Sequence, residues 1–114
     1  MLPKKERLTK KVFIKVFKEG LFVSSSTLSL RVKKVGIPNT PSQFAVVIPQ
    51  KIVKHKPEQN RLKRQFFALL QKKKPVIRAG LQAILFLKKE VKELSLKERE
   101  QALHELFSSA KLLR

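Results

Sequence analysis

The sequence of 114 residues contains no cysteine, which excludes disulfide bonds, thiolate metal sites and thiol catalysis. Aspartate is absent too, and five of the eight glutamates lie after residue 87, among lysines. A nuclease that holds Mg²⁺ on its own side chains needs clustered carboxylates, because Mg²⁺ demands oxygen ligands in octahedral positions. We therefore expect no catalytic residue and no metal site on the protein itself.

Glycine, histidine and long apolar runs are also scarce. The three glycines stand far apart, so the chain has no glycine-rich phosphate loop, and nucleotide hydrolysis is not expected. The two histidines, His55 and His104, are distant in sequence. A ribonuclease that uses His and Lys as general acid and base is not excluded by the sequence, but no feature of the sequence favours it. No apolar run approaches the ~18 residues of a membrane span, and the N-terminus lacks the apolar core of a signal peptide. We expect a cytoplasmic protein that uses neither a membrane nor a small-molecule cofactor.

Positive charge, in contrast, is abundant. Lys and Arg number 27 against 8 Glu, which gives a formal net charge of +19 and a sequence pI near 10.9. Residues 1–87 carry 20 of these cations and 3 Glu, whereas residues 88–114 carry 7 and 5. Because a polyanion would relieve this self-repulsion, we expect a polyanionic partner, and we interpret the C-terminal part as scaffold.

Hydropathy periodicity and turn residues predict the elements of the fold. In chain order they are a helix over 10–19 with Thr9 as its N-cap, strands within 21–25 and 27–35, a strand over 43–48, a helix from Pro57 to about Leu70, a strand over 82–87, and a helix after Ser95. The segment 43–48 is apolar on both faces, which predicts a place in the middle of the sheet, and 82–87 is predicted as another central strand. The order α-β-β-β-α-β-α indicates an α+β fold, a two-layer sandwich with about four strands.

The length suits a single RNA-binding domain over residues 1–114. Residues 1–7 are expected to be flexible, and residues 110–114 are liable to fray. A turn or hairpin loop is predicted over 36–42 from its Gly, Pro and Asn content. Ser95 and Glu98 have the spacing of a capping box, which supports the start of the last helix.

The segment from Lys51 to Lys74 is either a solvated charged face or a binding surface. Six Lys and Arg and a single acid, Glu58, lie between Lys51 and Arg64. A solvated face normally mixes the two signs, whereas this one is almost purely cationic, so binding of phosphates is favoured. The residues off the apolar stripe of the predicted helix are Asn60, Arg61, Lys63 and Arg64. On these residues alone the chain is interpreted as an RNA-binding or DNA-binding α+β domain.

The phenylalanines are mostly assigned to packing. Six of the eight fit core positions by periodicity. Phe13 and Phe17 stay open: core is the favoured interpretation, but a basic helix laid across a sheet can leave aromatic edges on which bases stack.

The segment QNRLKR, residues 59–64, resembles the R-N-R-x-K-R box of the bacterial ribonuclease P protein component. Three other segments resemble the same family in the same order: LTKKVFIKVFKEG its first helix, FAVVIPQKIVKHKPEQNRLKR its central strand, crossover loop and basic helix, and GLQAILFLKKEVKELSLKEREQALHELF its last strand and helix. The resemblance covers nearly the whole chain, and the combination is more specific than any single motif.

The resemblance implies a monomeric protein subunit of a ribonucleoprotein endoribonuclease. In that family the ribonuclease P RNA carries out the Mg²⁺-dependent hydrolysis that removes the 5′ leader of precursor tRNA, and the RNA binds most of the Mg²⁺. The implied fold has a left-handed β-α-β crossover, like the second domain of a small-subunit ribosomal protein. The implied RNA-binding residues are Lys51, Lys54, His55, Lys56, Asn60, Arg61, Lys63 and Arg64, and the implied leader-binding cleft contains Phe13, Phe17 and Arg31.

The sequence departs from the family pattern at several positions. Gln59 stands where the box begins with arginine, which removes a fixed charge, and Lys51–Ile52 replaces a pair of lysines. The strand that faces the cleft has no aromatic residue, its nearest candidates being Ser29 and Arg31. Surplus lysines, Lys56 and Lys72 to Lys74, are expected to compensate electrostatically. The alternatives are a noncatalytic RNA-binding protein of ribosomal or RNA-chaperone type and an autonomous basic ribonuclease.

Overall fold

The computed structural model describes residues 8–35 and 42–113, so the predicted flexible segment 1–7, most of the predicted loop 36–42, and Arg114 lie outside the described residues. The predicted α+β order is confirmed. The helices are α1 (Lys10–Glu19), α2 (Lys56–Lys73) and α3 (Leu96–Ser109), the strands are β1 (Leu21–Ser24), β2 (Leu28–Lys34), β3 (Gln43–Val47) and β4 (Leu81–Leu87), and the short 3-10 turns are η2 (Lys74–Val76) and η3 (Lys89–Glu93).

The four strands form one sheet in the order β1-β2-β4-β3. Strand β2 pairs antiparallel with both β1 and β4, whereas β3 pairs parallel with β4. A parallel pair needs a long crossover, and here α2 lies between β3 and β4 in the chain. The central place predicted for β4 is confirmed.

The central place predicted for β3 is wrong, because β3 is an edge strand. Its sequence is apolar on both faces because both faces of the strand pack against other parts of the protein. Phe44 and Val46 are buried in the main core, while Ala45 and Val47 are half-buried on the opposite face. The N–H of Leu8 also donates to the Phe44 carbonyl over 3.1 Å, so the preceding chain partly covers the free edge.

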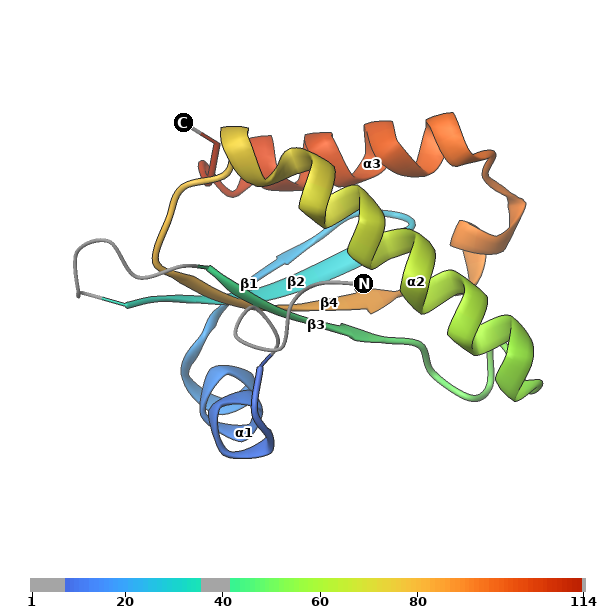
Figure 1. Ribbon diagram of the computed structural model, residues 1–114, viewed down its shortest axis with the longest axis horizontal. Coiled ribbons are helices and arrows are strands. Elements are labelled where there is room, and N and C mark those ends of the chain that lie inside the picture. Colours follow the sequence, from blue (N-terminus) through green and yellow to red (C-terminus); the bar gives the residue numbers. More distant parts are fainter. Residues whose placement is uncertain (1–7, 36–41, 114) are drawn as a thin grey trace.

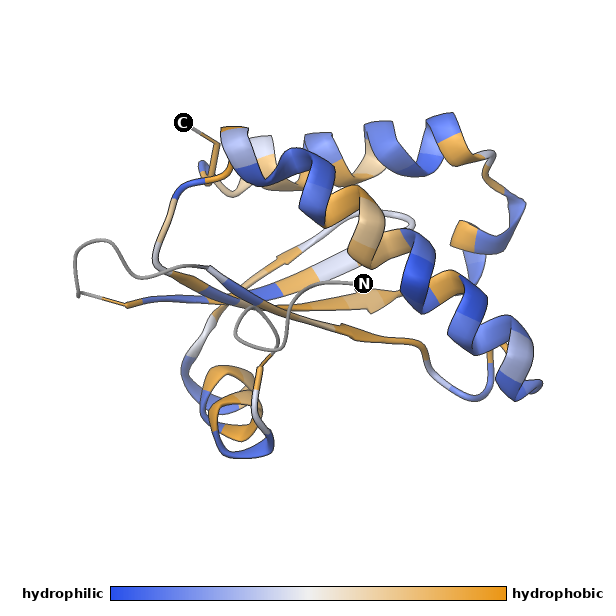
Figure 2. Ribbon diagram, viewed as in Figure 1, coloured by the Kyte–Doolittle hydropathy of each residue, from blue (hydrophilic) through white to orange (hydrophobic). Residues whose placement is uncertain are grey.

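Helices lie on both faces of the sheet. Figure 1 shows α2 and α3 together on one face and α1 on the other, so the predicted two-layer sandwich corresponds to the sheet with α2 and α3. The main core lies between these layers, and the orange, hydrophobic parts of α2 and α3 in Figure 2 are interspersed with blue ones, as in amphipathic helices. The α1 face has a smaller buried set, in which Val16 and Ile84 are fully covered.

The predicted caps at Thr9 and Ser95 form, whereas α2 runs to Lys73, beyond the predicted end near Leu70. The Thr9 side chain accepts a hydrogen bond from the Val12 N–H over 3.4 Å, and Ser95 and Glu98 form the reciprocal capping box. Hydrogen bonds from Ser95 to the Glu98 carboxylate lower the pKa of Glu98. After α1 the chain turns at Gly20, where an added Cβ would lie 2.6 Å from the Val16 carbonyl oxygen, so only glycine fits this turn without a shift of backbone.

The end of the chain returns to the sheet. The Leu112 side chain is buried, the Arg78 N–H donates to the Leu112 carbonyl over 2.8 Å, and Leu113 forms a β-bridge with Ile77. Thus residues 110–113 pack where fraying is predicted from the sequence. No helix within the described ranges is both long and apolar enough to cross a membrane.

Candidate nucleic-acid interface

Helix α2 presents a cationic face to solvent because its apolar residues are drawn into the core. Pro57 lies in the first turn, where its missing N–H leaves no helical hydrogen bond unmade. The buried stripe consists of Leu62, Phe66, Phe67, Leu69 and Leu70, four of which the sequence pattern predicts. Every predicted RNA-binding residue on this helix is exposed: Lys56, Asn60, Arg61, Lys63 and Arg64. The side chains are therefore held as an array on a rigid element.

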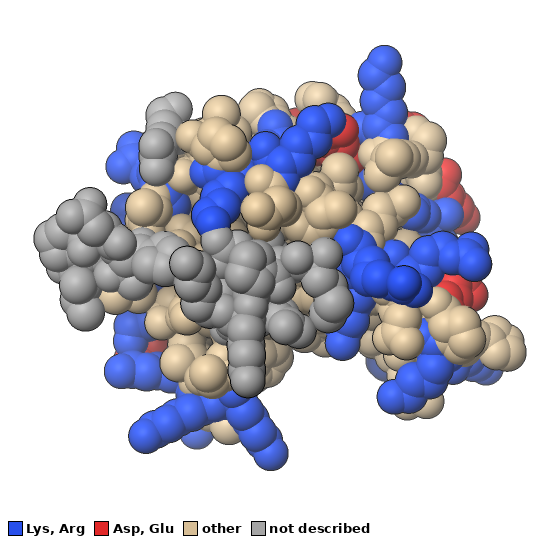
Figure 3. Space-filling model, in the orientation of Figure 1, with Lys and Arg blue, Asp and Glu red and all other residues tan. Residues whose placement is uncertain are grey.

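The cations of this face have no acidic partner among the described residues. Lys56, Arg61, Lys63 and Arg64 form no ion pair there, and the Arg64 Nε donates to the Asn60 carbonyl over 3.4 Å. A hollow of about 370 Å³ borders the same face, and its described lining residues are Asn60, Lys63, Arg64 and Phe67. In Figure 3, Lys and Arg side chains gather along the course of α2. Such an array can contact several phosphates at once.

The crossover loop before α2 adds the remaining predicted contacts. Lys51, Lys54 and His55 are all exposed. The loop is anchored from two sides, because the Gln59 amide Nε2 donates to the Val53 carbonyl and the Lys92 Nζ donates to the Ile52 carbonyl over 3.1 Å. The loop cations are thus carried on backbone that is tied to α2 and to η3.

Two residues that differ from the resembled pattern, Gln59 and Ile52, have structural contacts here. Gln59 is half-buried, and its amide donates to the Val53 carbonyl, so this position fixes the lysine-bearing loop. Ile52 is half-buried and packs against the main core. Sequence reasoning missed both roles, because the loop conformation that brings Val53 to Gln59 has no periodic signal.

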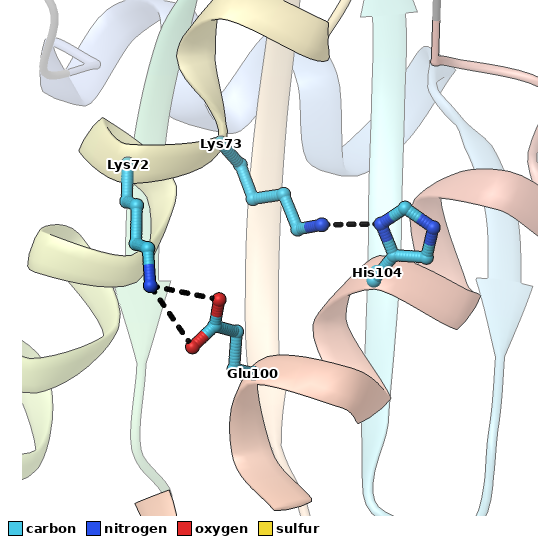
Figure 4. Close-up of polar contacts among 4 residues, drawn as sticks. All are labelled: Lys72, Lys73, Glu100 and His104. Atoms are coloured by element: carbon cyan, nitrogen blue, oxygen red, sulfur yellow. Dashed lines mark hydrogen bonds and ion pairs between the residues drawn. The ribbon is translucent and has the colours of Figure 1, made fainter. Parts of the chain in front are cut away.

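The C-terminal end of α2 is different. Lys72 pairs with Glu100 at 3.1 Å, and the Lys73 Nζ contacts the His104 Nδ1, both from α3 (Figure 4). About two turns earlier on α2, the Arg99 guanidinium donates to the Gln65 Oε1 over 2.6 Å. Lys72 and Lys73 therefore each have a partner on α3, although the Lys72 side chain remains exposed, and the expected electrostatic compensation by these lysines stays a prediction.

The predicted cleft residues lie on the α1 face, where two of the three meet. The Arg31 Cζ lies 4.7 Å from the centroid of the Phe17 ring, and the Phe17 ring is 45% exposed. Phe13, one turn earlier on α1, is half-buried and has no ring contact with this pair within the described chain. The interpretation of Phe17 as a core residue is wrong.

Two further phenylalanines join this surface. Phe22 on β1 is 57% exposed, with its ring centroid 5.1 Å from the Arg31 Cζ, and Phe86 on β4 packs edge-to-face on Phe17 at 6.1 Å. We call the set Phe17, Phe22, Arg31 and Phe86 the aromatic surface. The assignment of Phe22 to the core is wrong, and the aromatic residue that β2 lacks is supplied by its neighbours β1 and β4. The register of the sheet places these phenylalanines beside β2. The sequence pattern of one strand does not contain this register, so the pattern could not predict the aromatic surface.

The described residues offer no protein site for Mg²⁺. Nowhere in 8–35 or 42–113 do three or more His, Cys, Asp or Glu residues come close enough to hold a metal ion. The residues present therefore do not fit a magnesium site, since that ion takes oxygen ligands that a single isolated glutamate does not supply.

Comparison with known proteins gives a consistent result. Residues 2–111 match the family model of Ribonuclease P. The chain is 32% identical over 117 residues to the ribonuclease P protein component of Rippkaea orientalis (strain PCC 8801 / RF-1), covering 98% of this chain and 91% of that protein.

Solved structures show the same fold. A Staphylococcus aureus RNase P protein mutant with defective mRNA degradation activity superimposes with a TM-score of 0.84 at 16% identity, covering 96% of this chain and 91% of that one. The RNase P protein from Thermotoga maritima gives 0.77 at 23% identity, with coverage of 89% and 94%. The family model over residues 2–111 and the relative at 32% identity show that the chain belongs to the ribonuclease P protein family.

Proposed function

We propose that this protein is the subunit of ribonuclease P that binds the catalytic RNA and helps it to remove the 5′ leader of precursor tRNA. The observation that carries the proposal is the exposed face of α2, where Arg61, Lys63 and Arg64 have no acidic partner among the described residues. A fixed array of this kind suits the phosphate backbone of a folded RNA, because guanidinium groups bind phosphate oxygens in pairs.

The aromatic surface would receive the single-stranded leader. Exposed phenylalanine rings offer stacking to unpaired bases, and four lysines of α1, Lys10, Lys11, Lys15 and Lys18, supply positive charge on the same helix as Phe17. The predicted contribution of Phe13 is smaller than that of Phe17, since Phe13 is less exposed. The two surfaces lie on opposite sides of the sheet, so the protein would bridge the catalytic RNA and the substrate.

The hydrolysis itself would belong to the RNA. Mg²⁺ activates water and stabilises charge on the phosphate during such a reaction, and in our proposal the RNA partner holds most of these ions. The contribution of this chain is to bind and orient, through exposed cations and aromatic rings. We propose one copy of the protein in each ribonucleoprotein and a cytoplasmic location, where precursor tRNA is made.

Cleavage of precursor tRNA at low Mg²⁺ tests the proposal. Three reactions are compared: the ribonuclease P RNA of the same organism with the protein, this RNA without the protein, and the protein alone. We expect leader removal to need both components. Tight binding of RNA without stimulation of cleavage would support a noncatalytic RNA-binding protein instead, and cleavage by the protein alone would identify an autonomous ribonuclease.

A further inference from the structure

The Arg31 side chain is held in one orientation by three contacts. Its guanidinium lies over the rings of Phe17 and Phe22, with the Cζ 4.7 Å and 5.1 Å from their centroids. Its Nη1 also donates to the Phe17 backbone carbonyl over 3.1 Å. An arginine at a protein surface normally rotates among many rotamers, and these contacts remove much of that freedom before any ligand binds.

The fold brings these residues together from three elements. The register of β1 on β2 places Phe22 directly opposite Arg31, so both side chains project from the same face of the sheet. Phe17 comes from the last turn of α1, whose final carbonyls have no helical donor. Arg31 supplies a donor to one of them and thereby connects the helix end to the aromatic pair.

Most donors of Arg31 remain available. A guanidinium has five N–H donors, and Arg31 has no acceptor within the described chain other than the Phe17 carbonyl. The Glu19 carboxylate at the end of α1 pairs with Lys33 at 3.2 Å, not with Arg31. A guanidinium with a fixed plane and free donors can bind two adjacent acceptors at once.

We propose that Arg31 reads one nucleotide of the single-stranded leader by binding two adjacent acceptors on a base, with Phe22 as the positioning residue that holds it in plane. Guanine is the base expected, since its O6 and N7 form such a pair. The exposed ring surfaces of Phe17 and Phe22 favour a base over a phosphate, because a base can also stack there. The inference rests on the proposed function, which makes the leader the ligand.

Binding of precursor tRNAs to the assembled ribonucleoprotein tests the inference. The leaders carry guanine or another base at each position in turn, and a tRNA without a leader is included. We expect guanine at one position to strengthen binding about 5- to 10-fold. Phe22→Ala should remove most of this preference, and Arg31→Lys should remove it too, since an ammonium keeps the charge but not the planar pair of donors.

Leu21→Ala is the matched control. Leu21 precedes Phe22 on β1, is 72% exposed, and projects from the opposite face of the sheet, so its loss should leave the guanine preference unchanged. Thermal unfolding of each variant shows whether it folds, and Phe22→Leu replaces Phe22→Ala if the alanine variant does not.

The outcomes are separable. Leader-dependent binding with no base preference, or a preference that survives Phe22→Ala and Phe22→Leu, would overturn the inference and leave the proposed function standing. Equal affinity of the wild-type complex for tRNA with and without a leader would instead contradict the leader-binding part of the proposed function.

Discussion

The two ends of α2 carry the same kind of charge in different surroundings. In the N-terminal half, Arg61 and Arg64 are exposed and have no acidic partner among the described residues. Near the end, Lys72 pairs with Glu100, and Lys73 contacts His104. The difference comes from α3, which packs beside the C-terminal end of α2 and supplies these partners. We therefore expect the contribution of each cation of α2 to RNA binding to depend on what packs next to it.

The energetic consequence is asymmetric. An exposed pair such as Lys72 with Glu100 contributes at most about 1 kcal/mol to folding, so its role in stability is small. Lys72 lies beside a carboxylate and the Lys73 Nζ lies at a His104 ring nitrogen, so each would have to give up a contact within the protein to reach a phosphate, and we expect both to contribute less to RNA binding. The comparison predicts that equal losses of charge at the two ends have unequal effects on RNA affinity.

The largest effect is expected from removal of the free cations. Arg61→Ala combined with Arg64→Ala should weaken binding to ribonuclease P RNA about 10- to 100-fold, because two charge-assisted contacts are lost. Filter binding at a fixed salt concentration measures the change. The matched control is Lys72→Ala combined with Lys73→Ala, which removes the same formal charge from the same helix and should weaken binding less than threefold, about 0.6 kcal/mol. Comparable losses in the two variants would break the comparison.

A smaller effect is expected from the anchor of the crossover loop. Gln59→Ala removes the hydrogen bond to the Val53 carbonyl and should lower the free energy of unfolding by about 1 kcal/mol. RNA affinity should fall as well, since the loop that carries Lys51 and Lys54 is less ordered. Urea unfolding and filter binding measure the two changes. Gln59→Arg sharpens the result: if affinity rises in that variant, charge at this position matters more than the anchor.

The smallest effect on RNA binding is expected at the start of α3. Ser95→Ala removes the hydroxyl that accepts from the Glu98 N–H, which is one half of the capping box, and should cost about 1 kcal/mol of stability, with RNA affinity unchanged. The pKa of Glu98 is lowered in the folded protein, so its contribution to stability is present above its ordinary pKa of 4.5 and is lost as the pH falls through the folded value. Urea unfolding should therefore show a smaller difference between wild type and Glu98→Ala, which removes the carboxylate that accepts from the Ser95 N–H, at pH 3 than at pH 7. An equal difference at both pH values would contradict this assignment.

The sequence predicts the parts of the fold that depend on local patterns. Helix α1 has the predicted bounds, and the caps at Thr9 and Ser95 form as their residue types require. The exposed array on α2 follows from its apolar stripe, because a helix that buries one side must present the other. The errors concern contacts between segments distant in the chain. The edge position of β3, the exposure of Phe22 and the pairing of Lys72 with Glu100 depend on strand order, register and helix packing, which periodicity does not encode.

The salt dependence of RNA binding tests the central claim most directly. The logarithm of the affinity for ribonuclease P RNA is measured against the logarithm of salt concentration for the wild type, for Arg61→Ala with Arg64→Ala, and for Lys72→Ala with Lys73→Ala. We predict that loss of the two arginines makes the slope shallower by about 1.4 to 1.8, as expected for two lost phosphate contacts, while loss of the two lysines changes it by less than about 0.5. Equal changes of slope in the two variants would show that both ends of α2 contact RNA, and would contradict the account.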